Sequence, residues 1–252
     1  VRTDTLLTFH ESDMQKQDGV DPVYKKENTS SLLLTKARAP NWKHRENGFK
    51  DFERNPLMIK RLSTQGPRAC TGDFNGDGRT DVYVGGAKGQ AGALFIQQPD
   101  GKFTVSEQPA LQANKISEDL GCAFLDANGD GQLDLYVASG GSEFPVSSSA
   151  LADRLYLNDG KGQLLQTKDQ ILPAGRYESS SSVTASDFDG DGDMDLFVGI
   201  GLQPFAYGEQ TGGYILSNDG SGHFENVTPK IAPGLVKSGM ITDGVWSDYD
   251  GD

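Results

Sequence analysis

Several features that define common protein classes are scarce in this sequence. Its 252 residues include only two cysteines and three histidines, and no apolar run approaches the length of a membrane span. Cys70 and Cys122 are too few for a disulfide framework, and we expect small buried residues rather than a bridge. The Gly-x-Ser-x-Gly elbow, the His-Glu-x-x-His motif and the phosphate loop are also missing. The common hydrolase and nucleotide-binding classes therefore have no support.

Basic residues are in deficit as well. The chain has 23 Lys and Arg against 36 Asp and Glu, which gives a formal net charge of -13. Eleven of the basic residues lie between Lys25 and Arg68, so the acidic excess falls in the rest of the chain. We interpret that basic stretch as a solvated or internally paired segment. A chain this acidic is not expected to bind nucleic acid through phosphate contacts.

Glycine and clustered aspartate are abundant. The densest acidic stretch, Asp187 to Asp195, carries five carboxylates in nine residues, and the pattern recurs from Asp73, from Asp126 and from Asp248. Positions 1, 3, 5 and 9 supply side-chain oxygens and position 7 a main-chain carbonyl, which are the hard donors that Ca²⁺ prefers. The predicted calcium-site residues are Asp73, Asn75, Asp77, Arg79, Asp81, Asp126, Asn128, Asp130, Gln132, Asp134, Asp187, Asp189, Asp191, Asp193, Asp195, Asp248, Asp250 and Asp252.

Position 12 distinguishes these loops from EF-hands. An EF-hand needs a bidentate Glu there, between helices, whereas this chain has Val84, Val137 and Val198. We therefore expect loops that close between strands, with the valine on the second strand. Asn75 and Asn128 replace a carboxylate by a neutral oxygen, so the third loop is predicted to bind its ion most tightly.

Short apolar runs flank each acidic loop, and a second pair of runs with an Asp-Gly turn follows. Such a unit has four strands. The first aspartates of the four loops lie 53, 61 and 61 residues apart, a spacing typical of propeller blades. We predict an all-β fold, a β-propeller of four-stranded blades present as an incomplete arc. The first runs of the four blades are Ala69 to Thr71, Cys122 to Leu125, Val183 to Ser186 and Val245 to Ser247.

The N-terminal quarter has no such repeat. Thr5 to Phe9 and Leu32 to Leu34 are predicted as short strands, and residues 14–66 as an irregular lead-in with a short helix between Asn47 and Ser63. Its aromatic and imidazole side chains are expected to anchor the lead-in to the sheets rather than to bind a ligand; they are Trp42, His44, Phe49 and Phe52. The chain begins at Val1 without a signal region and its fourth loop is cut short, so we expect an internal fragment.

The repeat units over residues 67–252 resemble the FG-GAP/VCBS repeats of integrin-α-type propellers, and their loops are similar to the Asp-x-Asp-x-Asp-Gly-x-x-Asp calcium site of that family. Within it, the segments from Leu155 to Gly162 and from Asn218 to Thr228 resemble the second hairpin of bacterial ASPIC/UnbV proteins, relatives of cartilage acidic protein. Trp42 to Ser63 is similar to the lead-in of those propellers, and residues 1–13 resemble the tail of an UnbV domain.

This resemblance implies a bacterial, calcium-binding module that is extracellular, periplasmic or on the outer-membrane surface. We expect it to be non-enzymatic and to bind a protein or glycan ligand. Two alternatives remain, the propeller scaffold of a polysaccharide-degrading enzyme and a passive structural spacer. The repeat motif is informative about fold and says little about activity.

Overall fold

The computed structural model describes residues 42–168 and 177–248. The chain divides into two units, Val1–Lys36 and Ala37–Asp252, and every described residue belongs to the second. The strands predicted at Thr5 to Phe9 and at Leu32 to Leu34, and the UnbV-like tail at residues 1–13, lie outside the described residues.

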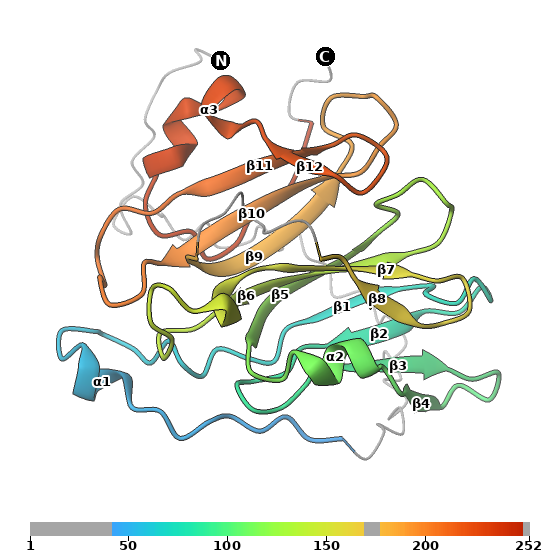
Figure 1. Cartoon of the computed structure of the whole chain (residues 1–252), viewed down its shortest axis with the longest axis horizontal. Helices are drawn as coiled ribbons and strands as arrows, with labels where there is room; N and C mark the ends of the chain where they lie inside the picture. The colour runs from blue at the N-terminus through green and yellow to red at the C-terminus, as the bar shows by residue number, and fades with distance from the viewer. Residues whose placement is uncertain (1–41, 169–176, 249–252) are drawn as a thin grey trace, which may run out of the picture. The chain divides into compact units, whose positions relative to one another are not determined.

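The described part is all-β, with three four-stranded antiparallel sheets, as the repeat pattern predicts (Figure 1). The sheets are ordered β1-β2-β3-β4, β5-β6-β7-β8 and β12-β11-β10-β9. Their strands are β1 Ala69–Gly72, β2 Asp81–Val84, β3 Ala93–Gln97, β4 Phe103–Ser106, β5 Glu118–Leu125, β6 Asp134–Gly140, β7 Arg154–Asn158, β8 Leu164–Gln166, β9 Ser179–Ser186, β10 Asp195–Leu202, β11 Gly213–Asn218 and β12 Phe224–Asn226.

Helices are short and lie between strands. They are α1 Asp51–Arg54, α2 Pro109–Ala113 and α3 Thr228–Ile231, with 3₁₀ turns at Ser149–Leu151 and Pro233–Lys237. The short helix expected between Asn47 and Ser63 is α1.

Each sheet is a repeat of one plan, because the acidic loop joins the first strand to the second. The last residue of the first strand pairs with the ninth residue of the loop, as in Gly72 with Asp81 and Leu125 with Asp134. Val84, Val137 and Val198 lie in the second strands, β2, β6 and β10. Strands therefore flank the loops on both sides, which confirms that they are not EF-hands.

Apolar side chains between neighbouring sheets form two main cores. One cluster joins the first and second sheets and includes Tyr83, Leu94 and Tyr156, all essentially inaccessible to solvent. The other joins the second and third sheets and includes Tyr136, Leu196 and others. The first strands β1, β5 and β9 lie side by side (Figure 1). The arrangement is propeller-like, and the three described sheets do not close a ring.

The two cysteines are free thiols, as predicted, although each residue is only half-buried. Cys70 on β1 and Cys122 on β5 both pack against the core between the first and second sheets. Burial, together with the adjacent Cys122 thiol, raises the pKa of Cys70. The two thiols meet because the first and second sheets pack face to face, and each cysteine points into the space between them.

Polar as well as aromatic contacts anchor the lead-in. Trp42 packs edge-on against Phe95 with ring centroids 6.0 Å apart, but Phe52 is 46% exposed, so the expectation that it is an anchor is wrong. Asp51 is fully buried instead and accepts hydrogen bonds from the Leu62 N–H and from the Ser63 hydroxyl. A buried carboxylate that accepts hydrogen bonds from backbone N–H groups can hold a segment in place where no apolar side chain does so.

Candidate metal centre

The backbone of each acidic loop curls at its fourth and sixth positions. In the third loop, Gly190 and Gly192 have φ angles of +78° and +98°, a region that L side chains rarely adopt. A Cβ added at either glycine would meet nothing within 4 Å, so backbone conformation and not space requires glycine there. The same left-handed pairs recur at Gly76, Gly78, Gly129 and Gly131.

The third loop brings three carboxylates together. One oxygen from each of Asp187, Asp189 and Asp195 lies within 4.8 Å of the others. In the described ranges, no other set of three His, Cys, Asp or Glu side chains gathers so closely. Three clustered hard oxygens are a donor set that fits Ca²⁺.

Asp187 is oriented by the glycines that follow it. Its two carboxylate oxygens accept the Gly190 N–H at 2.8 Å and the Gly192 N–H at 3.1 Å. Each carboxylate oxygen has a second lone pair, so these bonds hold the group without using its capacity to bind a cation.

The ninth residue of each loop is a buried carboxylate. Asp195 accepts the Phe188 N–H at 3.1 Å on one oxygen and the Asn218 N–H at 2.9 Å on the other. Asp81 and Asp134 have the same two kinds of partner and are equally buried. Burial raises the pKa of all three, in the case of Asp134 to about 6. These carboxylates thus tie the loop to the third strand of its blade.

The fifth and seventh residues of the third loop lie outside the three-carboxylate group. Asp191 accepts the Asp193 N–H at 2.9 Å and is not part of the cluster. Asp193, at the position predicted to contribute only its main-chain carbonyl, is half-buried, and its carboxylate lies against Gly220 in the β11–β12 turn. Partial burial, followed by the negative charges of Asp191 and Asp187, raises the pKa of Asp193.

The first loop neutralises part of its own charge. Arg79, at position 7, forms an ion pair with Asp77, and the Asn75 amide donates to the same Asp77 carboxylate at 2.8 Å. Asp73 accepts the Asp77 N–H at 3.0 Å and the Gly78 N–H at 2.7 Å. The first loop therefore contains cationic and amide donors where the third has only carboxylates.

The second loop is intermediate. Asn128 donates its amide to Asp130 at 3.2 Å, and the Gln132 N–H donates to Asp130 at 2.8 Å. Asp126 accepts the N–H groups of Asp130 and Gly131. This loop has an amide at position 3 and a neutral side chain at position 7.

An asparagine at the end of the third strand links neighbouring loops. The Asn158 amide of the second sheet donates to the Phe74 carbonyl of the first loop at 3.0 Å. In the third sheet, Asn218 donates to the Ala127 carbonyl of the second loop at 2.9 Å. In the sequence these asparagines read only as parts of Asn-Asp-Gly turns, although their recurrence at one blade position is a signal for this link.

Of the fourth predicted loop, only Asp248 is among the described residues, and it is exposed. Asp250 and Asp252 lie outside the described residues. The strand predicted at Val245 to Ser247 is wrong, because no neighbouring strand pairs with it in the described part of the chain and Val245 is 87% exposed. Trp246 instead stacks on Phe188 with ring centroids 5.7 Å apart.

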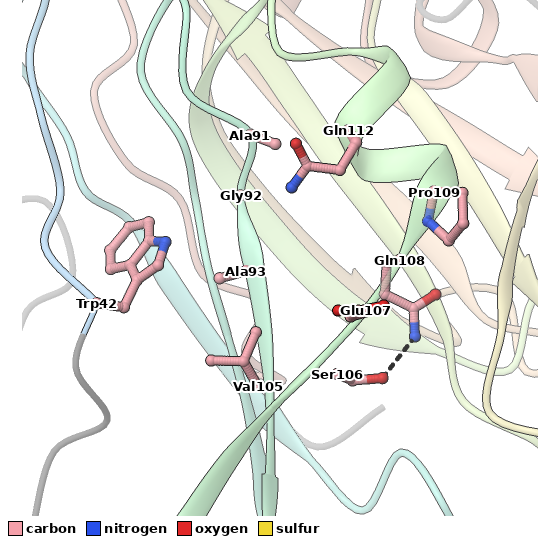
Figure 2. Close-up of a pocket in the computed structure, with 10 residues that line it drawn as sticks. All are labelled: Trp42, Ala91, Gly92, Ala93, Val105, Ser106, Glu107, Gln108, Pro109 and Gln112. Carbon is pink, nitrogen blue, oxygen red and sulfur yellow. Dashed lines mark hydrogen bonds between the residues drawn. The ribbon is translucent and has the colours of Figure 1, made fainter.

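A second candidate site is a cavity of about 530 Å³ between the lead-in and α2. Figure 2 shows the Trp42 indole on one side and Pro109 and Gln112 of α2 on the other. Gln108 is committed to the fold, since it donates to the Ser106 hydroxyl and accepts the Leu164 N–H. The lining residues are Trp42, Ala91, Gly92, Ala93, Val105, Ser106, Glu107, Gln108, Pro109 and Gln112.

Two segments of the chain, residues 73–137 and 139–198, match the FG-GAP-like repeat. The chain therefore contains FG-GAP-like repeats, and the matched segments include all three complete acidic loops. The predicted repeat family is confirmed at this level. The closer resemblance to ASPIC/UnbV proteins stays a prediction.

The chain matches no curated protein in sequence. Among solved structures, it is similar to a lectin from Agrocybe aegerita studied for its specific recognition of non-reducing terminal N-acetylglucosamine. The two share 16% identity with a TM-score of 0.41, over 70% of this chain and 42% of the lectin chain. This chain thus spans less than half the length of that lectin.

None of the described helices has the length and apolar character needed to cross a bilayer. The longest α-helix among them, α2, has five residues.

Proposed function

We propose that this chain is a non-enzymatic, calcium-binding part of an extracellular or cell-envelope propeller that binds a protein or glycan ligand. The observation that carries the proposal is the group formed by Asp187, Asp189 and Asp195. Clustered carboxylates repel one another, and no basic side chain of the described residues forms an ion pair with any of the three. A bound Ca²⁺ would remove that repulsion.

The role of the ion would be structural. Asp195 binds the backbone of β11, and the amide of Asn218 bonds the carbonyl of Met194 as well as that of Ala127 in the preceding loop. An ion held by the third loop would therefore fix the connection between β9 and β10. It would also support the contact between the second and third sheets.

The affinity expected of such a site favours a location outside the cytosol, where calcium is abundant. Extracellular modules bind Ca²⁺ with Kd of about 10⁻⁴ to 10⁻³ M, which is too weak for cytosolic levels. At millimolar calcium such a site contributes on the order of 1 kcal/mol by mass action. An extracellular, periplasmic or outer-membrane location agrees with this chemistry, and so does the predicted relation to bacterial ASPIC/UnbV proteins.

The cavity beside Trp42 supports a binding role. Ligand sites are concave and mostly apolar, with a few polar groups that fix orientation. Here an indole and a run of small residues line the cavity, while Glu107 and Gln112 are exposed at its edge. This combination suits the apolar face of a sugar ring with hydroxyl groups at its rim.

A glycan array probed with and without a calcium chelator tests the proposal. We expect glycan binding that is lost in Trp42→Ala and retained in the control Phe52→Ala, which removes an exposed aromatic outside the cavity. Dependence of the signal on calcium would support the calcium-stabilised module. Turnover of a polysaccharide would favour the enzyme scaffold instead. If neither glycans nor candidate protein partners bind, the passive spacer is favoured.

A further inference from the structure

A second group of acidic side chains lies at the end of the sheets opposite the acidic loops. Glu118 is the first residue of the eight-residue strand β5, at the end away from the loop, and Glu143 follows the end of β6. Both are buried, with exposed fractions of 0% and 3%. Glu46 of the lead-in adds a third negative charge close enough to act on Glu118.

The two buried carboxylates share one donor. The Asn47 amide nitrogen lies 2.9 Å from an oxygen of Glu143 and 3.4 Å from an oxygen of Glu118. The Asn47 amide oxygen accepts the Phe49 N–H at 2.8 Å, which fixes the amide with its nitrogen toward the two glutamates. The remaining oxygens, Glu118 Oε1 and Glu143 Oε2, are buried and have no hydrogen-bond partner.

Among the described residues, no cationic side chain forms an ion pair with Glu118 or Glu143. The Lys88 ammonium lies 4.6 Å from the centroid of the Phe144 ring, and Lys88 faces Glu118 through its backbone N–H. Arg154 pairs with Asp119 rather than with either glutamate. Two adjacent buried carboxylates without a counter-charge carry a large desolvation penalty, so either a proton or a cation must accompany them.

The Glu143 carboxylate packs against a glycine. Gly141 has a φ of +109°, and a Cβ at that position would overlap Glu143 Oε2, so any larger residue there would displace the carboxylate. His44 bonds Glu46 through Nε2 at 3.0 Å, and its buried Nδ1 has no partner. Glu46 is an exposed residue, and its negative charge acts on Glu118.

We propose that Glu118 and Glu143 form a second cation site, which binds a divalent ion of the Ca²⁺ type between their unpartnered oxygens. Carboxylate oxygens are the ligands that hard divalent cations prefer. Unlike the acidic loops, this site draws on β5, the turn after β6 and the lead-in, and contains no Asp-x-Asp-Gly pattern. Glu46 provides the negative charge on its solvent side.

Such an ion would join the lead-in to the second sheet. Asn47 contacts both glutamates, and Asp51 of α1 accepts the Ser142 hydroxyl in the turn that also carries Glu143. Arg54 donates to the Ser142 carbonyl at 3.1 Å. The cation would neutralise the acidic centre of this contact.

Calorimetric calcium titration of the full chain, with analysis of bound metal, tests the site. Glu143→Gln preserves shape and removes one negative charge, and Glu225→Gln is a matched control at an exposed position of β12. We expect Glu143→Gln to bind one calcium fewer than wild type and Glu225→Gln to bind the same number. Asp189→Asn in the third loop should remove a different calcium, so the two losses add.

The outcomes separate the two sites. Calcium lost with Glu143→Gln but not with Asp189→Asn would leave this site standing and count against the loop site. An unchanged calcium number in Glu143→Gln would overturn the second site and indicate a shared proton instead. Asn47→Asp supplies an independent check, because it replaces the amide donor by an oxygen ligand. We expect this variant to gain thermal stability from calcium more than wild type does; an equal loss of stability with calcium and with chelator would also contradict the site.

Discussion

The two ends of the same sheets manage negative charge in different ways. At the end opposite the loops, Asp119 and Asp153 are buried singly, each with its own protein partners. Asp119 pairs with Arg154 and accepts the Tyr83 hydroxyl, and Asp153 accepts the Tyr136 hydroxyl and the Ser139 N–H. At the loop end, the carboxylates gather in groups whose hydrogen bonds come mainly from the loop backbone.

The difference shows where an ion matters. Where a basic or hydroxyl side chain compensates a carboxylate, stability should be independent of calcium. Where only backbone N–H groups do so, as in the third loop, we expect stability to depend on calcium. The buried pair Glu118 and Glu143 is the exception at the end opposite the loops, because no basic or hydroxyl side chain of the described residues compensates it.

The largest effect should come from breaking the ion pair at the end opposite the loops. Arg154→Met leaves Asp119 as an uncompensated buried charge, and we expect the free energy of unfolding to fall by about 3–5 kcal/mol. Urea denaturation with calcium and with chelator measures it, with the exposed Arg68→Met as the control. The loss of unfolding free energy should be the same in both conditions. A loss that calcium reverses would contradict the difference between the two ends.

The next effect is a dependence on pH at Asp153. Burial raises the pKa of this carboxyl to about 7, against about 3.8 in the unfolded chain. Because the folded pKa is the higher one, the contribution of Asp153 to stability is complete below about pH 3.8 and is lost as pH rises through about 7. We expect the unfolding free energy of wild type to decline more between pH 5 and 8 than that of Asp153→Asn. Parallel pH profiles for the two proteins would contradict this assignment.

At the loop end, removal of one ligand should abolish the benefit of calcium in the third loop. We expect Asp189→Ala to lose roughly 1 kcal/mol of stability at millimolar calcium and almost nothing in chelator. Thermal melting under both conditions measures this, with Asp219→Ala in the neighbouring turn as the control. A loss of equal size in chelator would mean that Asp189 acts through the fold alone.

The smallest effect concerns the contrast between the first and third loops. Arg79 competes with an ion for Asp77, so Arg79→Gln should raise the calcium affinity of the first loop. Its ion pair is partly exposed and contributes only about 0–1 kcal/mol to stability. Calcium titration should therefore change while the melting temperature in chelator does not. Unchanged affinity would indicate that the arginine does not compete.

Much of the fold could be predicted because the repeat is local. The strands at Val82 to Val84 and Leu135 to Val137 follow their loops directly, and the glycines at the fourth and sixth positions allow the left-handed backbone that the loops need. The strand predicted at Val245 to Ser247 failed because a strand needs a partner that the sequence of one segment does not supply.

The candidate sites were predictable to different degrees. Asp187 and Asp195 could be assigned from spacing, since one loop carries both. The links from Asn158 and Asn218 to preceding loops, and the meeting of Glu118 with Glu143, join residues that lie far apart in the chain. Spacing within one segment carries no information on such contacts.

Calorimetric titration of calcium into Asp189→Ala and Asp193→Ala tests the central claim, that the third loop is a calcium site, most directly. Asp189 at position 3 belongs to the three-carboxylate group, whereas position 7 supplies only its main-chain carbonyl. We therefore expect Asp193→Ala to bind calcium nearly as wild type does and Asp189→Ala to lose the ion at this loop. Equal loss in the two variants, or no calcium binding by the wild-type chain, would contradict the account.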